Sequence, residues 1–391
     1  MKDYDVIVVG GGINGLTAAA YLAKAGLSVA VFEARGQCGA HCDTIELGIP
    51  GLLHSTHAAW LVPAMSPAMA DLDLEGFGLD LYGTDVLFAK TFRNRKNVVQ
   101  ALDPAVTQES LARISSRDAK TQATITQYLG ENALDALEIN QQLIFSAPSA
   151  KLLDRLAAFQ GGLLDRLGIA LSGDDLQRMT GFEVFEMLYE SEEVRTTPAA
   201  LGEFTGQWPL HHRVGSLALN LGAMSLMPVH TARGGSHALT HALVRCVVAH
   251  GGDIWGTCPV ERILVRDGRA HGVRLSADAL LPGEEIQARV VISNVTLAPT
   301  FLQMVGEDVI GPTRSRQIKG FNYDDPQLFG VYYALRGDPE FASAAYDPAV
   351  QRSWVGYLGG ESLDEIRSGL TRAASGVIPD DVMGRILQAG R

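Results

Sequence analysis

The first 33 residues hold a strand, a glycine-rich turn, a helix and a second strand, an order that strongly constrains the fold. The run "YDVIVVG" (4–10) is β-branched and apolar, as a buried parallel strand should be. The segment "INGLTAAAYLAKAG" (13–26) places leucine and alanine on one helical face and ends at a glycine. "LSVAVFE" (27–33) is a second buried strand that ends in an acid. Together they predict a βαβ unit within a parallel sheet.

The turn between the first strand and the helix has the spacing Gly10-x-Gly12-x-x-Gly15. Gly10 permits the tight turn, Gly12 lets the backbone approach a pyrophosphate, and Gly15 lets the helix pack closely on the strand. The free N–H groups of the first helical turn, which contains Ile13 and Asn14, would face the anion together with the positive end of the helix dipole. This context predicts a dinucleotide site, whereas the glycines alone would be weak support.

Glu33 ends the second strand, where an acid can accept hydrogen bonds from the hydroxyls of the adenosine ribose. Its charge would repel a 2′-phosphate and so disfavours NADP. The alternative is a glycine-rich turn without a ligand. The glycine motif by itself does not distinguish FAD from NAD.

The residues after Glu33 separate the two cofactors. "EARGQCGAHCDT" (33–44) resembles the E-x-R-x-x-x-G-G-x-x-x-T segment of the flavin amine oxidase and phytoene desaturase superfamily. That resemblance implies FAD, because the segment passes the FAD ribityl and pyrophosphate in the superfamily. It adds five residues to the predicted cofactor site: Ala34, Arg35, Gly39, Ala40 and His41. This sequence departs from the pattern at Ala40, which replaces the second glycine, and at His41, which replaces a basic residue.

The run "GGGINGLTAAAYLAKAGLSVAVFEAR" (10–35) looks most like the phytoene dehydrogenase-related oxidoreductases of this superfamily, and two later blocks agree with it. In the block 232–275, a glycine pair opens a helix, and Asp267-Gly268 forms the turn of a hairpin. The resemblance implies that Val260 meets the adenine through its backbone. The block 288–306 resembles the next strand of the cofactor domain, and it places Asn294 near the adenosine.

The fold class predicted from these blocks is α/β, with a discontinuous Rossmann-like FAD-binding domain and a second α+β substrate domain. The FAD-binding domain comprises residues 1–82 and 225–310, and the substrate domain comprises residues 83–224 and 311–391. Within the second domain, residues 149–168 have leucines at helical spacing. Further along the chain we expect a Pro/Arg-rich linker from 311, a strand at 328–337, and a helix over 362–375 that begins at Ser362 with Glu365 at capping-box distance.

Charge and composition exclude several classes of protein. A net charge of −12 without a basic patch argues against nucleic-acid binding. The four cysteines are few, no signal sequence precedes the first strand, and we therefore expect reduced thiols and a cytoplasmic location. Cys38-x-x-x-Cys42 lacks zinc spacing and a second ligand pair, so no metal is predicted. The apolar stretch 215–229 is too short to span a membrane, although peripheral membrane contact stays open.

Candidate catalytic residues lie in "GLLHSTHAAWLVP" (51–63), which corresponds to the family's stretch beside the isoalloxazine ring. His54 and His57 would share a face of a helix or line a loop, and one of them could act as a base or orient substrate. The alternative is that both are structural polar residues. A second histidine cluster and a set of tunnel-lining residues are weaker candidates, and the tunnel set could equally be core: His211, His212 and Trp208; Trp60, Met224, Met227 and Phe329.

The resemblance implies an FAD-dependent oxidoreductase that oxidises or desaturates an apolar organic molecule at a C–C or C–N bond by hydride transfer to flavin. Two rivals remain: a flavin-dependent isomerase without net redox change, and a flavin-binding or structural subunit of a larger complex. Family members continue past "VIPDDVMGRILQAGR" with a glycine-containing segment that covers the flavin. For this chain we expect a separate subunit that supplies that segment, a truncated or split product, or a different closure of the site.

Overall fold

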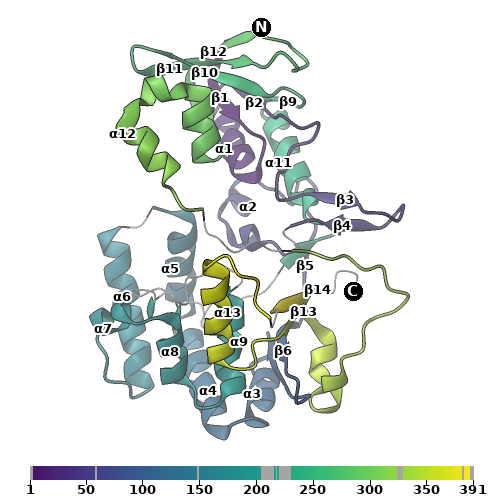
Figure 1. Cartoon of the computed structure of the whole chain (residues 1–391), viewed down its shortest axis with the longest axis vertical. Helices are drawn as coiled ribbons and strands as arrows, with labels where there is room; N and C mark the ends of the chain where they lie inside the picture. Colours follow the sequence, from purple (N-terminus) through teal and green to yellow (C-terminus); the bar gives the residue numbers. More distant parts are fainter. Residues whose placement is uncertain are drawn as a thin grey trace. The chain divides into compact units, whose positions relative to one another are not determined.

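A computed structural model of the chain describes residues 3–57, 60–147, 149–203, 215–216, 218–219, 230–323, 329–380 and 383–387. The chain folds into two compact units, each built from two separate stretches (Figure 1). The first unit contains Met1–Tyr82 and His230–Tyr323, and the second contains Gly83–Val229 and Asp324–Arg391.

A six-stranded sheet forms the centre of the first unit. Its order is β10-β11-β12-β1-β2-β9, in which β12, β1, β2 and β9 are parallel and β10, β11 and β12 are antiparallel. The strands are β1 (Tyr4–Val9), β2 (Val29–Phe32), β9 (Asp253–Trp255), β10 (Val260–Arg266), β11 (Arg269–Leu275) and β12 (Glu285–Ser293). The predicted βαβ unit and the α/β fold class are thereby confirmed.

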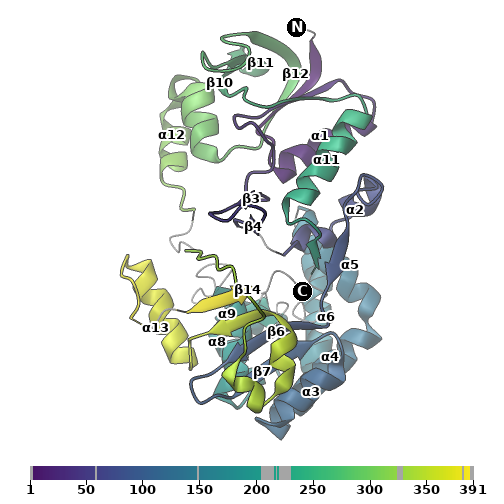
Figure 2. The same ribbon diagram turned by 90° about the vertical axis from the view of Figure 1, so that its right-hand side faces the viewer.

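The two faces of this sheet follow from the alternation of side chains along β1. Val6 and Val8 point to the face covered by α1 (Ile13–Lys24) and α11 (His237–Ala249), which lie side by side (Figures 1 and 2). Ile7 and Val9 enter a second core, shared with β10, β11 and the π-helix η3 (Ala298–Gly306). Burial on both faces explains why β1 is a continuous apolar run rather than an alternating one.

The remaining elements of the first unit are short, except for α12. They are β3 (Thr44–Glu46), β4 (Leu53–Ser55), η1 (Val62–Met65), α2 (Ala68–Asp71), β5 (Leu81–Gly83), β8 (His230–Ala232) and α12 (Glu307–Lys319). The prediction of a linker that begins at residue 311 was wrong, because residues 312–319 belong to the helical element α12. The helix tolerates Gly311 and Pro312 by kinking at Gly311, whose φ is +78°, and the Glu307 carboxylate accepts hydrogen bonds from Ser315 and Lys319 beyond the kink.

The second unit combines a four-stranded sheet with helices, which agrees with the predicted α+β character. The sheet order is β14-β13-β6-β7; β6 and β13 are parallel and the other neighbours antiparallel. Its strands are β6 (Val86–Thr91), β7 (Asn97–Ala101), β13 (Ser353–Leu358) and β14 (Gly384–Leu387). Its α-helices are α3 (Pro104–Ala112), α4 (Ser116–Glu131), α5 (Ala133–Phe145), α6 (Ala150–Arg166), α7 (Gly173–Arg178), α8 (Gly181–Leu188), α9 (Glu192–Glu203) and α13 (Leu363–Ala374), with 3-10 turns η4 (Ala342–Ala345) and η5 (Pro348–Arg352).

Two of the helices predicted for this unit are confirmed. Helix α6 begins after Ser149, and α13 begins after Ser362, whose hydroxyl accepts a hydrogen bond from the backbone N–H of Glu365. Only half of the expected capping box forms, since the Glu365 carboxylate accepts from the backbone N–H of Glu361 instead.

The strand predicted over 328–337 was wrong, because residues 329–337 adopt no strand or helix. Phe329 is 92% exposed, so it lines neither a core nor a tunnel. Apolar and aromatic residues favour a strand only where a partner strand and a packed face are available, and β13 takes its neighbours from β6 and β14.

No helix within the described ranges is both long enough and apolar enough to cross a bilayer. Of the apolar stretch 215–229, the structure describes Gly215, Ser216, Ala218 and Leu219, of which all but Ser216 are buried. His211, His212, Trp208, Met224 and Met227 lie outside the described residues.

Candidate functional site

The glycine turn joins β1 to α1, and two of its glycines are required for different reasons. Gly10 has a φ of +92°, a left-handed conformation that an L side chain strains, and its N–H donates to the carbonyl of Phe32 at 2.8 Å. A Cβ at Gly15 would lie 2.5 Å from the carbonyl oxygen of Gly10 and 2.9 Å from Cβ of Asn294. Gly15 therefore sets how closely α1 approaches the end of β1.

The start of α1 presents backbone rather than side chains. Gly12 is the residue before the helix, has no side chain with which to cap it, and pairs with Gly39 in an isolated parallel bridge. The first turn contains no acidic residue; Ile13 in it is half-buried and Asn14 is exposed. The first N–H groups of an α-helix have no acceptor within the helix, and those of α1 receive no side-chain cap from Gly12, so an anion could accept from them.

Asn294, predicted near the adenosine, lies against this turn. It follows β12, and its backbone N–H donates to the carbonyl of Val9 at 2.8 Å. A Cβ at Gly12 would lie 2.6 Å from Nδ2 of Asn294. The absence of a side chain at Gly12 therefore leaves room for the side-chain amide of Asn294.

Glu33 is buried at the end of β2 and is fixed by two backbone donors. Its Oε2 accepts from the N–H of Gly11 at 2.7 Å, and its Oε1 accepts from the N–H of Arg35 at 2.8 Å. Each carboxylate oxygen keeps a lone pair for a further donor. The carboxylate thus joins the glycine turn to the segment that follows β2, while Ala34 beside it is exposed.

Val260 lies at the start of β10, close to the same acid. The preceding residues run beside 33–35: the N–H of Cys258 donates to the carbonyl of Glu33, and the N–H of Thr257 donates to the carbonyl of Arg35. Val260 itself is half-buried. The structure therefore brings three distant parts of the sequence, the turn, residues 33–35 and residues 257–260, to one end of the parallel strands.

Arg35 and Asp43 form an ion pair that the sequence pattern did not predict. Nη2 of Arg35 lies 2.8 Å from Oδ2 of Asp43, which is buried. This hydrogen bond holds the pKa of the Asp43 carboxyl below its usual value. On the other side of Asp43, Nδ1 of the buried His237 lies 3.5 Å from Oδ1, and it has no hydrogen-bond partner within the described residues. No sequence spacing predicts the contact between Asp43 and His237, because His237 lies far from Asp43 in the sequence, on α11.

The segment after Asp43 is anchored on the first residues of α11. The hydroxyl of Thr44 accepts from the N–H of His237, and the hydroxyl of Ser55 accepts from the N–H of Ser236, each at 3.1 Å. A Cβ at Gly235, whose φ is +92°, would lie 2.4 Å from Oγ1 of Thr44. Gly235, the second glycine of the pair before α11, is thus needed for the β3–β4 hairpin to reach the helix.

Gly39, Ala40 and His41 form the turn that precedes Asp43. Gly39 has a φ of +130° and donates to the carbonyl of Gly11 at 2.9 Å. Ala40 has a φ of +49°, so an alanine occupies the left-handed region where the resembling family carries glycine. The exposed ring of His41 packs edge-on against that of His57, with ring centroids 4.8 Å apart.

The two candidate catalytic histidines are not on a helix. His54 lies on β4, opposite Ile45 of β3, and His57 follows the strand in a bend. Nδ1 of His57 lies 2.9 Å from the hydroxyl of Thr56. Of the two arrangements left open by the sequence, the shared helical face was wrong, and the two side chains lie on a hairpin edge and the bend after it.

The cysteines near the site are buried and poorly suited to reaction. Burial and the charge of Glu33 raise the pKa of Cys38 to about 11, and burial raises that of Cys42. Both thiols stay protonated near neutral pH, which argues against a covalent bond from Cys42 to a flavin. Across the described residues, no group of three or more His, Cys, Asp or Glu side chains is arranged to hold a metal ion.

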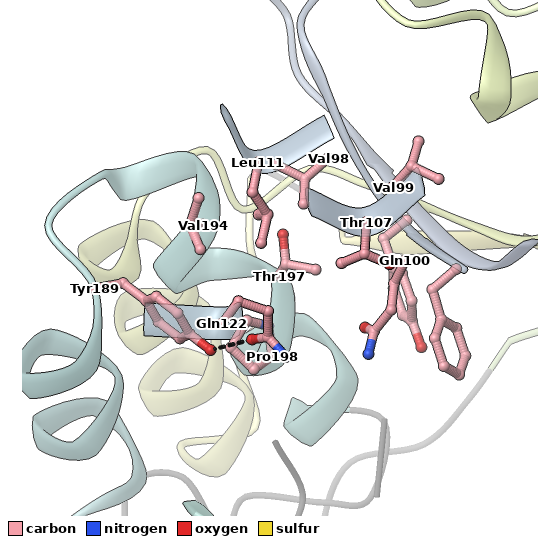
Figure 3. A pocket seen from close by; sticks show the side chains of 12 residues that line it. Val98, Val99, Gln100, Thr107, Leu111, Gln122, Tyr189, Val194, Thr197 and Pro198 are labelled. Atoms are coloured by element: carbon pink, nitrogen blue, oxygen red, sulfur yellow. Dashed lines mark hydrogen bonds between the residues drawn. The ribbon is translucent and has the colours of Figure 1, made fainter. Parts of the chain in front are cut away.

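The second unit contains a small cavity between its sheet and helices α3, α4 and α9 (Figure 3). Apolar side chains such as Val98 and Pro198 line it together with Gln100 and Gln122, and the hydroxyl of Tyr189 donates to Oε1 of Gln122 at 2.7 Å. Its volume of about 50 Å³ accommodates a few water molecules. The cavity is too small to hold the apolar organic substrate expected from the sequence.

Comparison with known proteins agrees with a dinucleotide site in the first unit. Residues 8–72 match the family of NAD(P)-binding Rossmann-like domains. A mouse protein, pyridine nucleotide-disulfide oxidoreductase domain-containing protein 2, is 29% identical over 385 residues, which cover 89% of this chain and 63% of the mouse protein. The chain thus spans less than two thirds of the length of the mouse protein and of its rat counterpart.

Two bacterial enzymes are also similar. One of the subunits of limonene dehydrogenase from Castellaniella defragrans is 25% identical over 98% of this chain and 68% of its own length. The zeta-carotene-forming phytoene desaturase of Myxococcus xanthus is 24% identical over 75% of this chain and 53% of its own length. Among solved structures, PF1083 protein of Pyrococcus furiosus shares the fold, with a TM-score of 0.54 and 15% identity over 98% of this chain and 79% of that one. The chain is therefore a homologue of phytoene desaturase and of a limonene dehydrogenase component, with a Rossmann-like dinucleotide-binding domain at its N-terminus, as the resemblance in its sequence predicts.

Proposed function

We propose that the first unit binds FAD and that the protein is an oxidoreductase that oxidises or desaturates an apolar organic substrate. One observation carries the cofactor site: the hydrogen bond of 2.7 Å from the N–H of Gly11 to Glu33. This hydrogen bond fixes Glu33, which would bind the adenosine ribose, relative to the glycine turn, which would bind the pyrophosphate. This hydrogen bond supports a site in which the two halves of an adenosine diphosphate group would bind side by side.

The residues present fit a dinucleotide, and the segment that follows Glu33 favours FAD over NAD. The start of α1 offers backbone N–H groups, and the cradle is narrow enough that a Cβ at Gly12 would displace the amide of Asn294. The segment 33–44 resembles the flavin-contacting segment of the amine oxidase and phytoene desaturase superfamily. The relatives named limonene dehydrogenase and phytoene desaturase support oxidation of an apolar molecule.

When bound, FAD would supply the redox chemistry by accepting a hydride from a substrate C–H bond. The chain's own part is to hold the cofactor and to place the substrate. We propose that His54 or His57 orients the substrate or accepts a proton, because both lie in the segment 51–63 that is expected beside the flavin ring. His57 is pre-oriented for such a role by the Thr56 hydroxyl and by the ring of His41.

The visible spectrum of the purified chain tests the cofactor assignment. We expect the absorption bands of oxidised flavin at a stoichiometry near one per chain. The variant Gly12→Ala should lower the flavin content, because its Cβ would clash with Asn294 beside the pyrophosphate position. Gly130→Ala is the matched control, since a Cβ there meets no atom within 4 Å. Loss of flavin in the control alone, or equal flavin in both variants, would contradict the assigned site.

Two alternatives predict different results. A flavin-dependent isomerase would convert its substrate without bleaching the flavin under anaerobic conditions, whereas the oxidoreductase would bleach it stoichiometrically. A structural subunit would show no flavin absorption of its own. The name of the Castellaniella relative, which is one subunit of its enzyme, is the observation that supports the structural-subunit alternative.

We also propose that further polypeptide, on a partner subunit or a longer chain, completes the flavin-facing half of the site. The chain spans 63% of the mouse relative, and the β3–β4 hairpin beside His54 exposes several large apolar side chains that such a segment could cover. These are Ile45, Leu47, Ile49, Leu52 and Leu53. Native mass spectrometry of protein purified from its source tests this, since a lone 391-residue chain that holds full flavin would refute it. The four reduced, buried cysteines favour a cytoplasmic location for the complex.

A further inference from the structure

Arg35 is placed where Rossmann-type sites often read the phosphate of NADP. In such sites an acid at the end of the second strand accepts the ribose 2′-hydroxyl, and a nearby arginine receives a 2′-phosphate where one is present. The backbone N–H of Arg35 donates to Glu33 at 2.8 Å, so this arginine lies directly beside the ribose-reading acid. Its side chain is 57% exposed and long enough to reach a phosphate.

The guanidinium of Arg35 is nevertheless engaged by Asp43. Nη2 lies 2.8 Å from Oδ2, a charge-assisted hydrogen bond to a carboxylate that is itself only 9% exposed. Because Asp43 is buried, moving Arg35 away would leave its charge without that partner, which is costly.

Asp43 itself has little freedom to follow a moving arginine. Its carbonyl oxygen accepts from the N–H of Thr56 at 3.1 Å and from the hydroxyl of Ser236 at 3.4 Å, which ties its backbone to the end of β4 and the start of α11. The buried ring of His237 closes the other side of the carboxylate. The anchor of Arg35 is therefore set by elements far from the glycine turn.

We propose that Asp43 is a specificity-determining residue: by holding Arg35 it restricts the site to adenine dinucleotides whose ribose 2′-hydroxyl is free. Glu33, Arg35 and Asp43 together carry one net negative charge, so a 2′-phosphate meets repulsion from Glu33 and an arginine whose charge is already balanced by Asp43. This inference rests on the proposed function, since it requires that the adenosine half of a dinucleotide binds beside Glu33.

Calorimetric titration of the full chain, freed of any bound flavin, with ADP-ribose and 2′-phospho-ADP-ribose tests the inference. The wild type should prefer ADP-ribose. Glu33→Gln removes the repulsion but leaves Arg35 engaged, so it should gain little affinity for the 2′-phosphorylated probe. Glu33→Gln combined with Asp43→Asn removes the charge that balances the guanidinium of Arg35, and affinity for that probe should rise by on the order of 10-fold over Glu33→Gln alone.

Asp80→Asn is the matched control, because it removes an equally short ion pair, Asp80 with Arg233 at 2.8 Å, from the same unit. It should leave the preference between the two probes unchanged. Asp43→Glu, which keeps a carboxylate, should retain the preference of the wild type.

A further pair of variants tests the inference should Asp43→Asn fail to fold. If Arg35 is held by Asp43, then Glu33→Gln alone and Glu33→Gln with Arg35→Gln bind 2′-phospho-ADP-ribose equally well. The inference is overturned if Glu33→Gln alone matches the variant that also carries Asp43→Asn, or if removing Arg35 abolishes a gain made by Glu33→Gln. Failure of the proposed function looks different, because ADP-ribose and FAD would then bind to none of the proteins.

Discussion

Replacing Ala40 by glycine removes a side chain from a residue whose backbone lies in the left-handed region, with a φ of +49°. An L-residue in this region costs about 1–2 kcal/mol relative to a right-handed conformation. Glycine avoids that cost but loses about 0.5–1 kcal/mol more backbone entropy on folding. Since Ala40 is exposed, its methyl group contributes little burial, and the expected net result is stabilisation of the first unit by about 0.5–1 kcal/mol.

Urea denaturation followed by circular dichroism measures this difference, with the transition of the first unit fitted separately. The control is Ala34→Gly, because Ala34 is also exposed, lies in the same segment and has no positive φ. That change should destabilise the unit by about 0.5–1 kcal/mol. Equal destabilisation by both substitutions would refute the reasoning, because it would mean that Ala40 does not occupy the left-handed region in solution.

The first unit supports three further predictions. Gly15→Ala should lower both the stability of the unit and its flavin content, because the new Cβ would lie 2.5 Å from the carbonyl oxygen of Gly10; thermal unfolding and the visible spectrum measure the two effects. Arg35 lowers the pKa of Asp43 in the folded state, so this ion pair stabilises the fold at pH values above the ordinary pKa of 3.8, and the stabilisation is lost as the pH falls below that value. In Arg35→Gln the free energy of unfolding should therefore fall less steeply as the pH is lowered, and an unchanged pH dependence would contradict the ion pair. Cys38, with its pKa raised to about 11 and its side chain buried, should react with a thiol reagent at about pH 8 only as fast as the unit unfolds, and rapid labelling of the native protein would count against its burial.

The local order of the first unit could be predicted because its signals lie close together in the sequence. The apolar run of β1, the glycine spacing and the alanine-rich face of α1 each restrict the backbone within a few residues. The turn at Asp267-Gly268 is a similar case, since both residues have the positive φ that this hairpin turn requires.

Features that depend on distant partners could not be predicted in this way. The run 328–337 has the composition of a strand, but whether it pairs is decided by which strands flank β13. Residues 307–319 form two helical stretches that meet at a kink at Gly311, whose backbone is not helical (φ +78°, ψ +167°), and Glu307 accepts hydrogen bonds from Ser315 and Lys319 across that kink. Local propensity gave the wrong result for 328–337 because tertiary pairing outweighed it, whereas at Gly311-Pro312 the helical backbone is interrupted, as Gly-Pro favours, and the chain resumes as a helix after it.

The candidate site depends on residues that lie far in the sequence from the glycine motif. A hydrogen bond joins the glycine turn directly to Glu33. The segment that runs from Glu33 to the β3–β4 hairpin is held in place by the start of α11, because Thr44 and Ser55, which lie close to Asp43, accept hydrogen bonds from backbone N–H groups there. A change at Gly235 or His237 would therefore alter the proposed dinucleotide site through Asp43 and Arg35 without lying in the glycine turn. The glycine spacing is enough to propose a phosphate site, whereas the proposed choice between dinucleotides would depend on an ion pair whose anchor on α11 is distant in the sequence.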